Sequence, residues 1–591
     1  MKRLFCKFFL IIFFPSYIFA VIPSYSVKFS GLKNHEILRV LEDNSQLIQL
    51  QQHPPRSINA LKYRAETDIP NLLEILKTYG YFDAKIITDI EPTSSGVSVF
   101  VFIEAGPRYI LDAFNIYSTP CEKKLPFLRC KYLSLEDLEI QIKRPTSYRD
   151  IINTDLKVLT GLSDCGYPLA STHSREVIVD RKSKIITVDM CVNPGPLCHF
   201  GYTTMAGLET IKPLFIAKKI RWKEGDLYSP KEIEETQKRL LETNLFGSVL
   251  ISHKEQLDSQ EQLPMKITVT EAKHKNISLG VNFATIDGFG ASIGWANRNV
   301  NQMGEQVSIN FDISQRSNSG DFIYRKPDFA KLDQDYVFRL LANSERIHVY
   351  NSFSYGMTNR IDRKIDKRTY ISYGFKQEYI EVKKSINNGY FFLLGLPVYF
   401  CYSTANHLLN PTKGFTIIYK PTPYCNLKIK DRFFLKQRLI NNLYFPVTKN
   451  DFLVLAFRIQ LGSIIGPNIN KLPFNKLFLG GSDDDLRGYR YKTVSPKDYK
   501  GDSTGGRSAI YLTFEPRFRV TKTIGFVPFV DFGNVTRKQY PTPIGKWRKS
   551  LGIGLRYFTF FGPLRFDIGF PLNRSKQDPK YRVYVSIGQT F

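Results

Sequence analysis

After the first twenty residues, the sequence has no apolar stretch long enough to cross a membrane as a helix. A spanning helix needs about 20 predominantly apolar residues, and no later stretch approaches roughly 18. Any membrane-spanning part of this chain must therefore be built from strands. Because unpaired backbone groups are costly in lipid, such strands have to close into a barrel.

The sequence also lacks the motifs of common catalytic and nucleotide-binding sites. It has no G-x-S-x-G nucleophile motif, no Walker-type lysine loop and no H-E-x-x-H zinc motif. Residues 288–290 and 552–554 read Gly-x-Gly but do not open a helix, so we interpret these glycines as strand residues that relieve curvature. The aspartates at 483–485 lack the alternating spacing of a calcium loop. We therefore expect no enzymatic activity, no metal and no cofactor.

Cysteine is scarce, with eight residues of which no two have the C-x-x-C spacing of a zinc site. The seven that follow the first twenty residues are Cys121, Cys130, Cys165, Cys191, Cys198, Cys401 and Cys425. Two pairs are close in sequence, Cys121 with Cys130 and Cys191 with Cys198, and both are candidate disulfides in an oxidising compartment. The sequence alone leaves the pairing open.

Acidic residues are few compared with basic ones, since 82 lysines and arginines face 55 aspartates and glutamates, a net charge of +27. No nucleic-acid motif accompanies this charge, so we expect no nucleic-acid partner. An outer-membrane lipid or lipopolysaccharide surface explains the positive charge better than nucleic acid does. A generally basic proteome would explain the charge about as well. Aromatic residues make up 14% of the chain, which argues against disorder and is typical of the girdles of membrane barrels.

The first twenty residues have the features of a secretory signal peptide. Lys2 and Arg3 precede an apolar run around residues 8–14, and a small residue, Ala20, offers a cleavage site. We therefore predict that residues 1–20 are a signal peptide and that the rest of the chain is exported.

The part of the chain before residue 274 repeats one pattern of strands and helices. Its first copy reads as a strand, two helices and two strands, with the second helix expected over residues 68–79 and ended by Gly80. Residues 166–168 and 245–247 correspond to this helix exit in the later copies. A unit that repeats at roughly 80–90 residues indicates an array of small α+β modules. We place these modules at residues 21–107, 108–195 and 196–273.

Helical periodicity disappears in the last region, residues 274–591. About sixteen stretches of roughly 8–12 residues alternate apolar and polar side chains, the length that a tilted membrane strand needs. The last strand is expected over residues 581–591, with Tyr581 and Phe591 on its apolar face. The predicted fold is therefore a set of α+β modules followed by a 16-stranded antiparallel transmembrane β-barrel.

Turn lengths predict the orientation of this barrel. The connections at residues 520–521 and 560–561 are short, whereas those at 534–547 and 573–580 are long. In membrane barrels of this kind, short turns face the periplasm and long loops face the outside. The α+β modules, which precede the first strand, are therefore expected in the periplasm.

One connection, over residues 464–506, is far longer than the usual length of about 2–6 residues. Its aromatic side chains are unlike those of a disordered loop, so we expect it to be packed. The loop carries a motif made of Gly480, Gly481, Leu486, Arg487, Gly488 and Tyr489. A later strand-like stretch, residues 529–533, carries Asp531 and Gly533 on the face expected to point into the lumen.

These two motifs together resemble the sixth-loop signature and the F-x-D-x-G strand of the Omp85 family of outer-membrane assembly proteins. The resemblance implies that the loop folds back into the barrel lumen and that Arg487 pairs with Asp531. Glu515 and Asp567 have the same lumenal parity, so they are alternative partners. A guanidinium suits this place because it offers a bidentate fork that a lysine lacks.

The resemblance extends to both ends of the chain. The repeated modules resemble POTRA domains, the periplasmic modules of the same family. An aromatic terminal residue, here Phe591 with Tyr581 about one strand length earlier, resembles the signal that barrel-assembly machinery recognises, although an ordinary girdle aromatic would look the same. The implied location is the bacterial outer membrane, with the POTRA-like modules in the periplasm.

The resemblance implies a factor that inserts or exports β-barrel and autotransporter-type clients without nucleotide hydrolysis. Three modules with this loop look most like the TamA branch, which implies a TamB-like periplasmic partner anchored in the inner membrane, besides unfolded client proteins and outer-membrane lipids. A BamA-like general insertase and a two-partner secretion pore or passive channel are the alternatives. A surface adhesin that works through its long loops is a further one.

Overall fold

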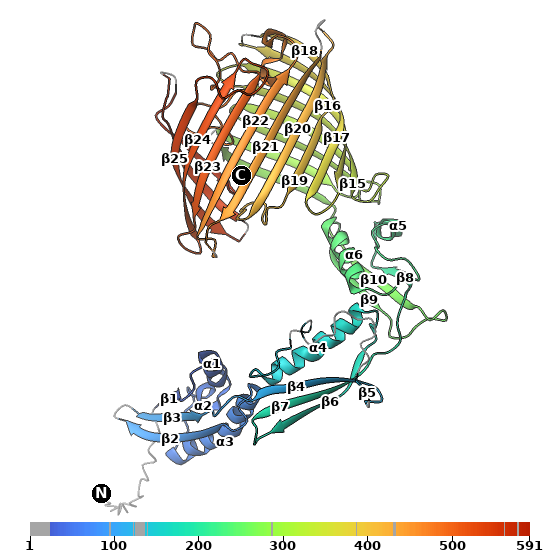
Figure 1. Ribbon diagram of the computed structural model, residues 1–591, viewed down its shortest axis with the longest axis vertical. Coiled ribbons are helices and arrows are strands. Elements are labelled where there is room, and N and C mark those ends of the chain that lie inside the picture. The colour runs from blue at the N-terminus through green and yellow to red at the C-terminus, as the bar shows by residue number, and fades with distance from the viewer. Residues whose placement is uncertain are drawn as a thin grey trace, which may run out of the picture. The chain divides into compact units, whose positions relative to one another are not determined.

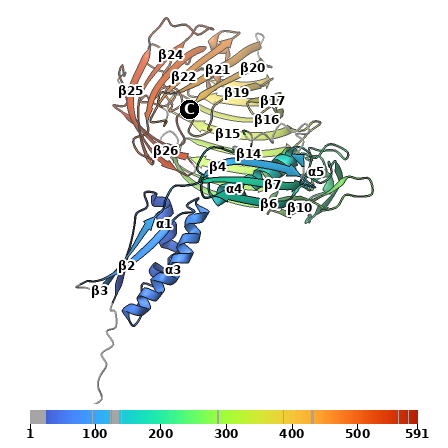
Figure 2. The same ribbon diagram turned by 60° about the horizontal axis from the view of Figure 1, so that its bottom comes forward.

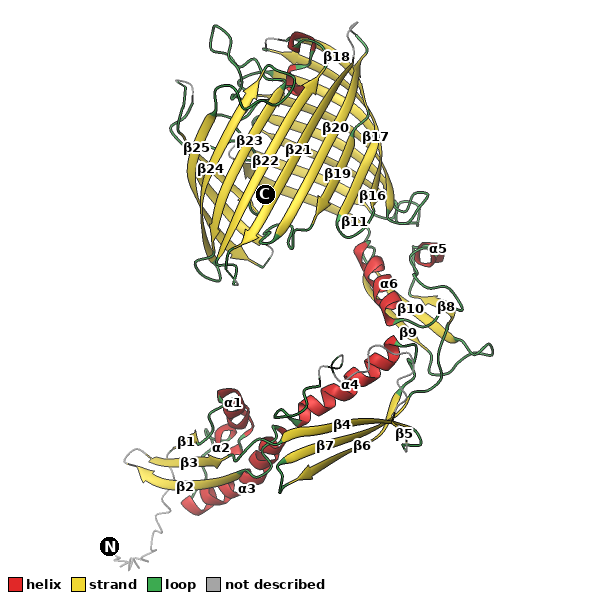
Figure 3. Ribbon diagram, in the orientation of Figure 1, coloured by secondary structure: helices red, strands yellow, loops and turns green. Residues whose placement is uncertain are grey.

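The computed structural model describes residues 24–591 except for short segments. The residues left out of this range are 94–95, 122, 125–135, 137, 139, 285–287, 386, 429–432, 449, 561 and 576–577. The predicted signal peptide and Cys130 lie outside the described residues. Three small sheets precede one large antiparallel sheet (Figures 1 and 3).

The first small sheet has the strand order β1-β3-β2 and is accompanied by three helices. Its elements are β1 (Tyr25–Ser30), α1 (His35–Asn44), α2 (Gln46–Gln49), α3 (Ile58–Thr78), β2 (Lys85–Thr93) and β3 (Gly96–Glu104). The buried residues Leu61, Ala65, Leu72 and Leu76 recur along one side of α3 at helical spacing. They share one hydrophobic core with Val99 of the central strand, so the amphipathic helix covers one face of the sheet.

Helix α3 begins at Ile58, after the capping residue Ser57, and not at Asp68 as the sequence suggested. Asp68 is buried in the middle of the helix. Its carboxylate accepts hydrogen bonds from the hydroxyl of Ser45 at 2.6 Å and from the N–H of Leu47 at 3.3 Å. The aspartate therefore ties α3 to the neighbouring helices, which a local capping pattern cannot reveal.

The second small sheet has the order β5-β4-β7-β6. Its elements are β4 (Ile110–Ser118), β5 (Lys123–Lys124), α4 (Tyr148–Asp164), β6 (Ser171–Asp180) and β7 (Ile185–Asn193). Helix α4 starts with a capping box, in which Ser147 and Asp150 each accept a hydrogen bond from the other residue's backbone N–H.

A disulfide joins Cys121 to Cys191 in this sheet. Strand β7 runs parallel to β4 with Cys191 opposite Tyr117, so the turn after β4 brings Cys121 back to the neighbouring strand. Both candidate pairs from the sequence are therefore wrong, because sequence proximity says nothing about this strand pairing. Cys165 is also disulfide-bonded, whereas the described free cysteines are Cys198, Cys401 and Cys425.

The third small sheet has the order β8-β10-β9. Its elements are β8 (Phe200–Ala206), α5 (Pro213–Ala217), α6 (Pro230–Glu242), β9 (Phe246–His253) and β10 (Leu263–Glu271). The predicted α+β modules are thus confirmed as a fold class, while their division at residues 107 and 195 stays a prediction.

Glu271 ends strand β10 and is almost completely buried. Its carboxylate accepts hydrogen bonds from the backbone N–H groups of Glu209 at 2.9 Å, Thr210 at 3.0 Å and Ile211 at 2.9 Å. Burial alone would raise the pKa of Glu271, but these bonds and one from the Thr210 hydroxyl lower it to about 2. The charged carboxylate therefore fixes the 209–211 segment against the end of β10.

The large sheet contains the strands β11 to β27 in sequence order (Figure 2). They are β11 (Lys275–Ala284), β12 (Gly288–Asn297), β13 (Gln306–Ser314), β14 (Ser317–Lys326), β15 (Gln334–Arg346), β16 (Asn351–Lys364), β17 (Thr369–Lys383), β18 (Gly389–Gly395), β19 (Val398–Ser403), β20 (Gly414–Asn426), β21 (Phe433–Pro446), β22 (Leu453–Ile465), β23 (Ser508–Phe518), β24 (Ile524–Thr536), β25 (Arg548–Thr559), β26 (Gly562–Pro571) and β27 (Arg582–Ile587).

Strands β18 and β19 are two halves of one barrel strand, because both pair with β17 on one side and with β20 on the other. Pro397 lies between them and has no N–H to donate. Its carbonyl still accepts from the N–H of Gly374 at 3.1 Å, and the N–H of Leu396 donates to Pro423 at 3.0 Å. The 17 labelled strands therefore make the predicted sixteen-stranded barrel, with one interruption.

Apolar and polar side chains alternate between the two faces of this sheet as the sequence predicted. On β26, Leu564, Phe566 and Phe570 are exposed, whereas Arg565 and Asp567 are buried. The charged residues point into the barrel and the apolar ones face outward, where a transmembrane barrel meets lipid. None of the described helices is both long and apolar enough to cross a membrane.

The first and last strands do not pair along their backbones within the described residues, although they come close to each other. Strand β27 is also shorter than expected, ending at Ile587. Gly588 follows with a φ of 91°, a left-handed conformation that bends the chain away from the strand. The expectation that Phe591 continues the outward face of Tyr581 is therefore wrong.

Candidate functional site

The long loop between β22 and β23 is folded and packed. It covers residues 466–507, since β22 continues to Ile465, and contains the short 3-10 helices η1 (Ile469–Lys471) and η2 (Phe474–Lys476). Its apolar side chains share one buried cluster with residues of the barrel wall. The buried loop members are Leu472, Phe474, Leu477, Phe478, Leu486, Tyr489 and Val494, and the wall members include Ile380, Leu393, Ala509 and Tyr511.

The two glycines of the motif form a tight turn inside this loop. Gly480 and Val494 exchange backbone hydrogen bonds of 2.8 and 3.0 Å. Gly481 has a φ of 110°, and a Cβ atom there would lie 2.2 Å from the carbonyl oxygen of Arg490. The N–H groups of Gly481 and Ser482 both donate to Oδ1 of Asp485, at 2.9 and 2.8 Å. The turn sets the position of the Leu486–Tyr489 segment that follows.

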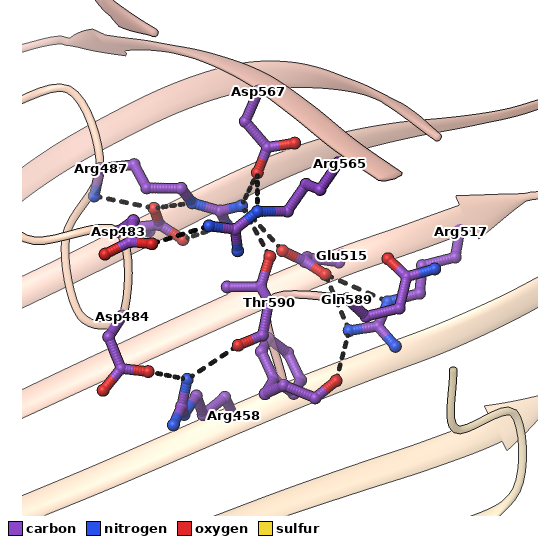
Figure 4. A network of polar contacts seen from close by, with 12 residues as sticks. Arg458, Asp483, Asp484, Arg487, Glu515, Arg517, Arg565, Asp567, Gln589 and Thr590 are labelled. Carbon is purple, nitrogen blue, oxygen red and sulfur yellow. Dashed lines mark hydrogen bonds and ion pairs between the residues drawn. The ribbon is translucent and has the colours of Figure 1, made fainter. Parts of the chain in front are cut away.

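Arg487 lies at the centre of a buried group of carboxylates (Figure 4). It donates to Asp531 through Nε, 2.8 Å from Oδ2, and through Nη2, 2.8 Å from Oδ1. Its Nη1 donates to Oε1 of Glu515 at 2.8 Å and to Oδ2 of Asp567 at 2.9 Å. All four side chains are at most 1% exposed. Arg487 therefore contacts every one of its three candidate partners, each on a different strand.

This geometry uses the full fork of the guanidinium. Asp531 on β24 takes the two parallel bonds, and it also accepts the backbone N–H of Arg487 at 3.2 Å. Bidentate charge-assisted bonds are stronger than neutral ones and fix the orientation of both groups. The face of the same guanidinium lies 3.3 Å from the ring centroid of Phe529, a cation–π contact worth about 2 kcal/mol when desolvated.

The residues after Arg487 hold the loop against the last strands of the barrel. The N–H of Gly488 donates to the hydroxyl of Tyr584 on β27 at 2.9 Å. Gly488 has a φ of 91°, and a Cβ there would meet the backbone of Gly569 on β26 at 3.1 Å. The hydroxyl of Tyr489 donates to the backbone oxygen of Lys549 at 2.8 Å. The loop thus contacts β24, β25, β26 and β27 through four consecutive residues, Leu486 to Tyr489, of which Leu486 lies against Gly533.

Further arginines neutralise the carboxylates around Arg487. Arg517 donates to Glu515 at 2.9 Å, Arg556 to Asp567 at 2.5 Å, and Arg565 to Asp483 of the loop at 2.8 Å. Together with the Arg487–Asp531 pair, four arginines thus meet four carboxylates. Such near-neutrality is what allows so many charges to be buried together, because each charge loses its water but gains a partner.

The last three residues, Gln589 to Phe591, also join this network instead of continuing β27. Gln589 accepts from Nε of Arg556 at 2.7 Å, and the hydroxyl of Thr590 lies 3.3 Å from Nη1 of Arg487. The carbonyl of Thr590 accepts from Arg458 at 3.3 Å, and that of Phe591 from Arg517 at 3.0 Å. Figure 4 shows Gln589 and Thr590 among Arg458, Arg487 and Arg517.

Sequence reasoning located the loop motif and Asp531, and the structure brings them together. Sequence reasoning placed Tyr581 and Phe591 on the same face of one strand, and the structure places them in different surroundings. Tyr581 is exposed before β27, with its ring 6.3 Å from that of Phe570, whereas the ring of Phe591 lies 4.9 Å from the guanidinium of Arg517. The arginines Arg458, Arg517, Arg556 and Arg565 were missed as site residues. The available signal was their position on the lumen-facing parity of apolar strands, where a charge needs a partner.

Comparison with known proteins agrees with this architecture. Residues 299–591 match the Omp85 superfamily domain. This part of the chain belongs to the Omp85 superfamily. An "Outer membrane protein assembly factor BamA" of Nitratidesulfovibrio vulgaris is 23% identical over 547 residues, covering 89% of this chain and 68% of the relative. A protein of the same name from Neisseria meningitidis serogroup B is 18% identical over 595 residues, covering 89% of this chain and 72% of the relative.

Among solved structures, the crystal structure of BamA from Haemophilus ducreyi lacking POTRA domains 1–3 has a TM-score of 0.68 at 16% identity. The match covers 80% of this chain and 99% of that one, and it supports the fold. The barrel of this Omp85 protein lies in the outer membrane, and its POTRA-like modules lie in the periplasm. Among the described residues, no three or more His, Cys, Asp or Glu side chains are arranged so that they could hold a metal ion.

Proposed function

We propose that this Omp85 protein helps to insert or export β-barrel and autotransporter-type clients across the outer membrane, in a TamA-like role and without nucleotide hydrolysis. The observation that carries the proposal is the pair of barrel edges at β11 and β27, which lie near each other without backbone pairing in the described part of the chain. Unpaired strand edges in lipid offer hydrogen-bonding groups to an incoming strand.

The last strand favours such an opening in two ways. Strand β27 has 6 residues, fewer than the roughly 9–11 that a tilted strand needs to cross the hydrocarbon core. A bilayer beside a short strand has to thin, which lowers the barrier for inserting a client. The residues beyond Gly588 bind Arg487 and Arg517 and therefore do not extend β27.

The Arg487 network supports this role by holding the strands on the β27 side of the seam in place. It connects the loop to β23, β24 and β26 through one guanidinium. With these strands fixed, movement is confined to the β11–β27 boundary. The free energy for assembly then comes from the backbone hydrogen bonds that the client forms and from the burial of the client itself. No nucleotide is required.

The small sheets provide further places for an extended client or partner. Strands β1 and β2 are the edges of the first sheet, and β6 is an edge of the second. An extended chain can add to such an edge as an extra strand, with main-chain hydrogen bonds giving affinity. We assign these edges to unfolded clients and to a TamB-like, inner-membrane-anchored periplasmic partner.

A BamA-like general insertase is the second candidate, and the curated relatives with that name favour it. Depletion of the protein, followed by quantification of the outer-membrane proteome, separates the two. Loss of a subset of clients, especially autotransporter-like barrels, is the expected result. Loss of nearly all barrel proteins would assign the BamA-like role, and loss of one secreted protein would assign a dedicated two-partner pore.

A further inference from the structure

A cavity of about 740 Å³ at one end of the barrel is lined by four arginines among its residues. It lies where the connections after β13, β15 and β26 meet the long loop, and the chain enters the barrel at the other end of these strands. The charged lining residues are Arg316, Arg346, Arg490, Arg582 and Asp578, and the other titratable ones are His348, Tyr491 and Tyr581. Because the modules precede β11 in the periplasm, this end faces the outside of the cell.

Three of the four arginines in this cavity lack a counter-charge among the described residues. The guanidinium groups of Arg316, Arg346 and Arg490 make no ion pair with any described residue. Asp578 is the one acidic lining residue, and its carboxylate already accepts two bonds of 2.7 Å from Ser575. Like charges that converge without a counter-charge repel each other, and a bound anion would relieve this repulsion.

The chemistry of the cavity matches a phosphate group better than a single carboxylate. Arginine forks bind phosphate oxygens in pairs, and several forks can share one phosphate. Arg582 also donates to the backbone oxygen of Tyr489 at 3.5 Å, which links the cavity to the loop motif. A phosphate held here would contact the long loop, the start of β27 and the strands that follow β11.

Two apolar side chains point to a lipid as the source of the phosphate. Tyr581, directly before β27, and Val583 in β27 line the same cavity and have the parity of the outward-facing side chains of this strand. Tyr581 is 57% exposed and lies beside Phe570, which is 43% exposed on the neighbouring strand. Acyl chains can pack along this exposed apolar surface while the headgroup meets the arginines, whereas a free phosphate ion would use only the charged half.

We propose that this cavity binds the phosphate group of a phosphorylated lipid of the outer leaflet, with the lipid seated across the outer end of the β11–β27 seam. The bound headgroup joins Arg316 and Arg346 on one side of the seam to Arg582 on the other. The proposal rests on the orientation of the barrel and is independent of which clients the protein serves.

The test uses the full-length protein in phosphatidylcholine nanodiscs titrated with lipid A that carries two phosphates, with binding measured by native mass spectrometry. The variant Arg316→Ala/Arg346→Ala/Arg490→Ala is expected to bind this lipid about tenfold more weakly or worse. Lys331→Ala/Lys367→Ala/Arg368→Ala removes the same charge from exposed residues of the periplasmic turns and is the matched control, expected to bind as the wild type does.

Three results would overturn the proposal. Equal affinity of the wild type and the arginine variant would show that these arginines do not bind the lipid. Equal affinity for lipid A stripped of both phosphates would show that the phosphate group is not what the cavity recognises. Full displacement of the lipid by millimolar inorganic phosphate would make the cavity a site for soluble anions. Unchanged client assembly in the arginine variant would leave the lipid site standing, so this test and the depletion experiment fail separately.

Discussion

Arg487 shows how much of the loop's position depends on one side chain. Its guanidinium is at most 1% exposed and touches carboxylates from three strands. A charge buried to this degree is stable only with its partners, and the partners are equally dependent on it. Removing one side therefore leaves the others as uncompensated buried charges.

We expect Arg487→Ala to destabilise the barrel by about 3–5 kcal/mol, because three buried carboxylates lose their central partner. Arg487→Lys should recover part of this, since an ammonium keeps the charge but lacks the fork. The measurement is the temperature at which the folded form loses its faster electrophoretic mobility. Lys500→Ala, an exposed position of the same loop, is the control. Unchanged heat resistance of Arg487→Ala would contradict the role given to this residue.

Gly488 tests the close approach of the loop to β26. Gly488→Ala is expected to destabilise by about 3 kcal/mol, since the new methyl is strained at positive φ and also collides with backbone. Gly501→Ala is the matched control, because Gly501 has a φ of 85° in the same loop but nothing within 4 Å of its missing Cβ. That variant should lose only about 1 kcal/mol. Equal losses in denaturant melts would show that packing against β26 contributes nothing.

At the residue scale, the sequence located Arg487 and Asp531 through a motif and placed Asp531 on the lumenal face by strand parity. Strand parity placed Glu515 and Asp567 on the lumenal face as well, so it could not decide which of the three carboxylates pairs with Arg487. The structure explains the ambiguity, because a guanidinium has enough donors to bind all three carboxylates. The supporting arginines escaped notice since each one alone resembles an ordinary lumenal charge.

At the scale of elements, Glu271 links β10 to the segment before α5. Its carboxylate binds three consecutive backbone N–H groups, Glu209 to Ile211. The next residue, Lys212, donates its backbone N–H to the backbone oxygen of Gln302 at 2.9 Å, and Gln302 lies in a turn of the barrel. Glu271 therefore orders the stretch that contacts the turn between β12 and β13.

This contact should depend on pH. Because the pKa of Glu271 is lowered from 4.5 to about 2, its stabilisation of about 3 kcal/mol is complete above the unfolded pKa and is lost as pH falls from about 4.5 toward 2. Amide exchange at residues 209–211, corrected for the intrinsic rate, should speed up over this range. Glu271→Gln should show fast exchange already at neutral pH. Protection that does not change between pH 5 and 2 would contradict the assignment.

Element boundaries divide into those that local sequence decides and those that it does not. Most barrel strands follow from alternation, because one face meets lipid and the other the lumen. The start of α3 and the end of β27 do not. Asp68 lies inside α3 because its carboxylate has a partner outside this helix. The last strand ends before Gly588 because Gln589 to Phe591 contact the lumenal arginines. Neither partner is near in sequence.

For the whole molecule, the sequence predicted the order of the parts: exported α+β modules, then a barrel with a folded-in loop. It could not predict the disulfide between Cys121 and Cys191, which depends on the pairing of β4 with β7. It also could not predict how the barrel closes. Closure depends on the short β27 and on β11, whose residues Ile277, Leu279 and Val281 are strongly exposed.

The central claim is that the protein works through the unpaired β11–β27 boundary while the Arg487 network holds the neighbouring strands. The most direct test replaces one residue within 277–281 and one within 583–587 by cysteine, and selects a pair that forms a disulfide across the seam. In cells depleted of the wild type, the oxidised variant should fail to assemble clients, and a reductant should restore assembly. Each single-cysteine variant should remain active. Full client assembly with the seam cross-linked would contradict the account.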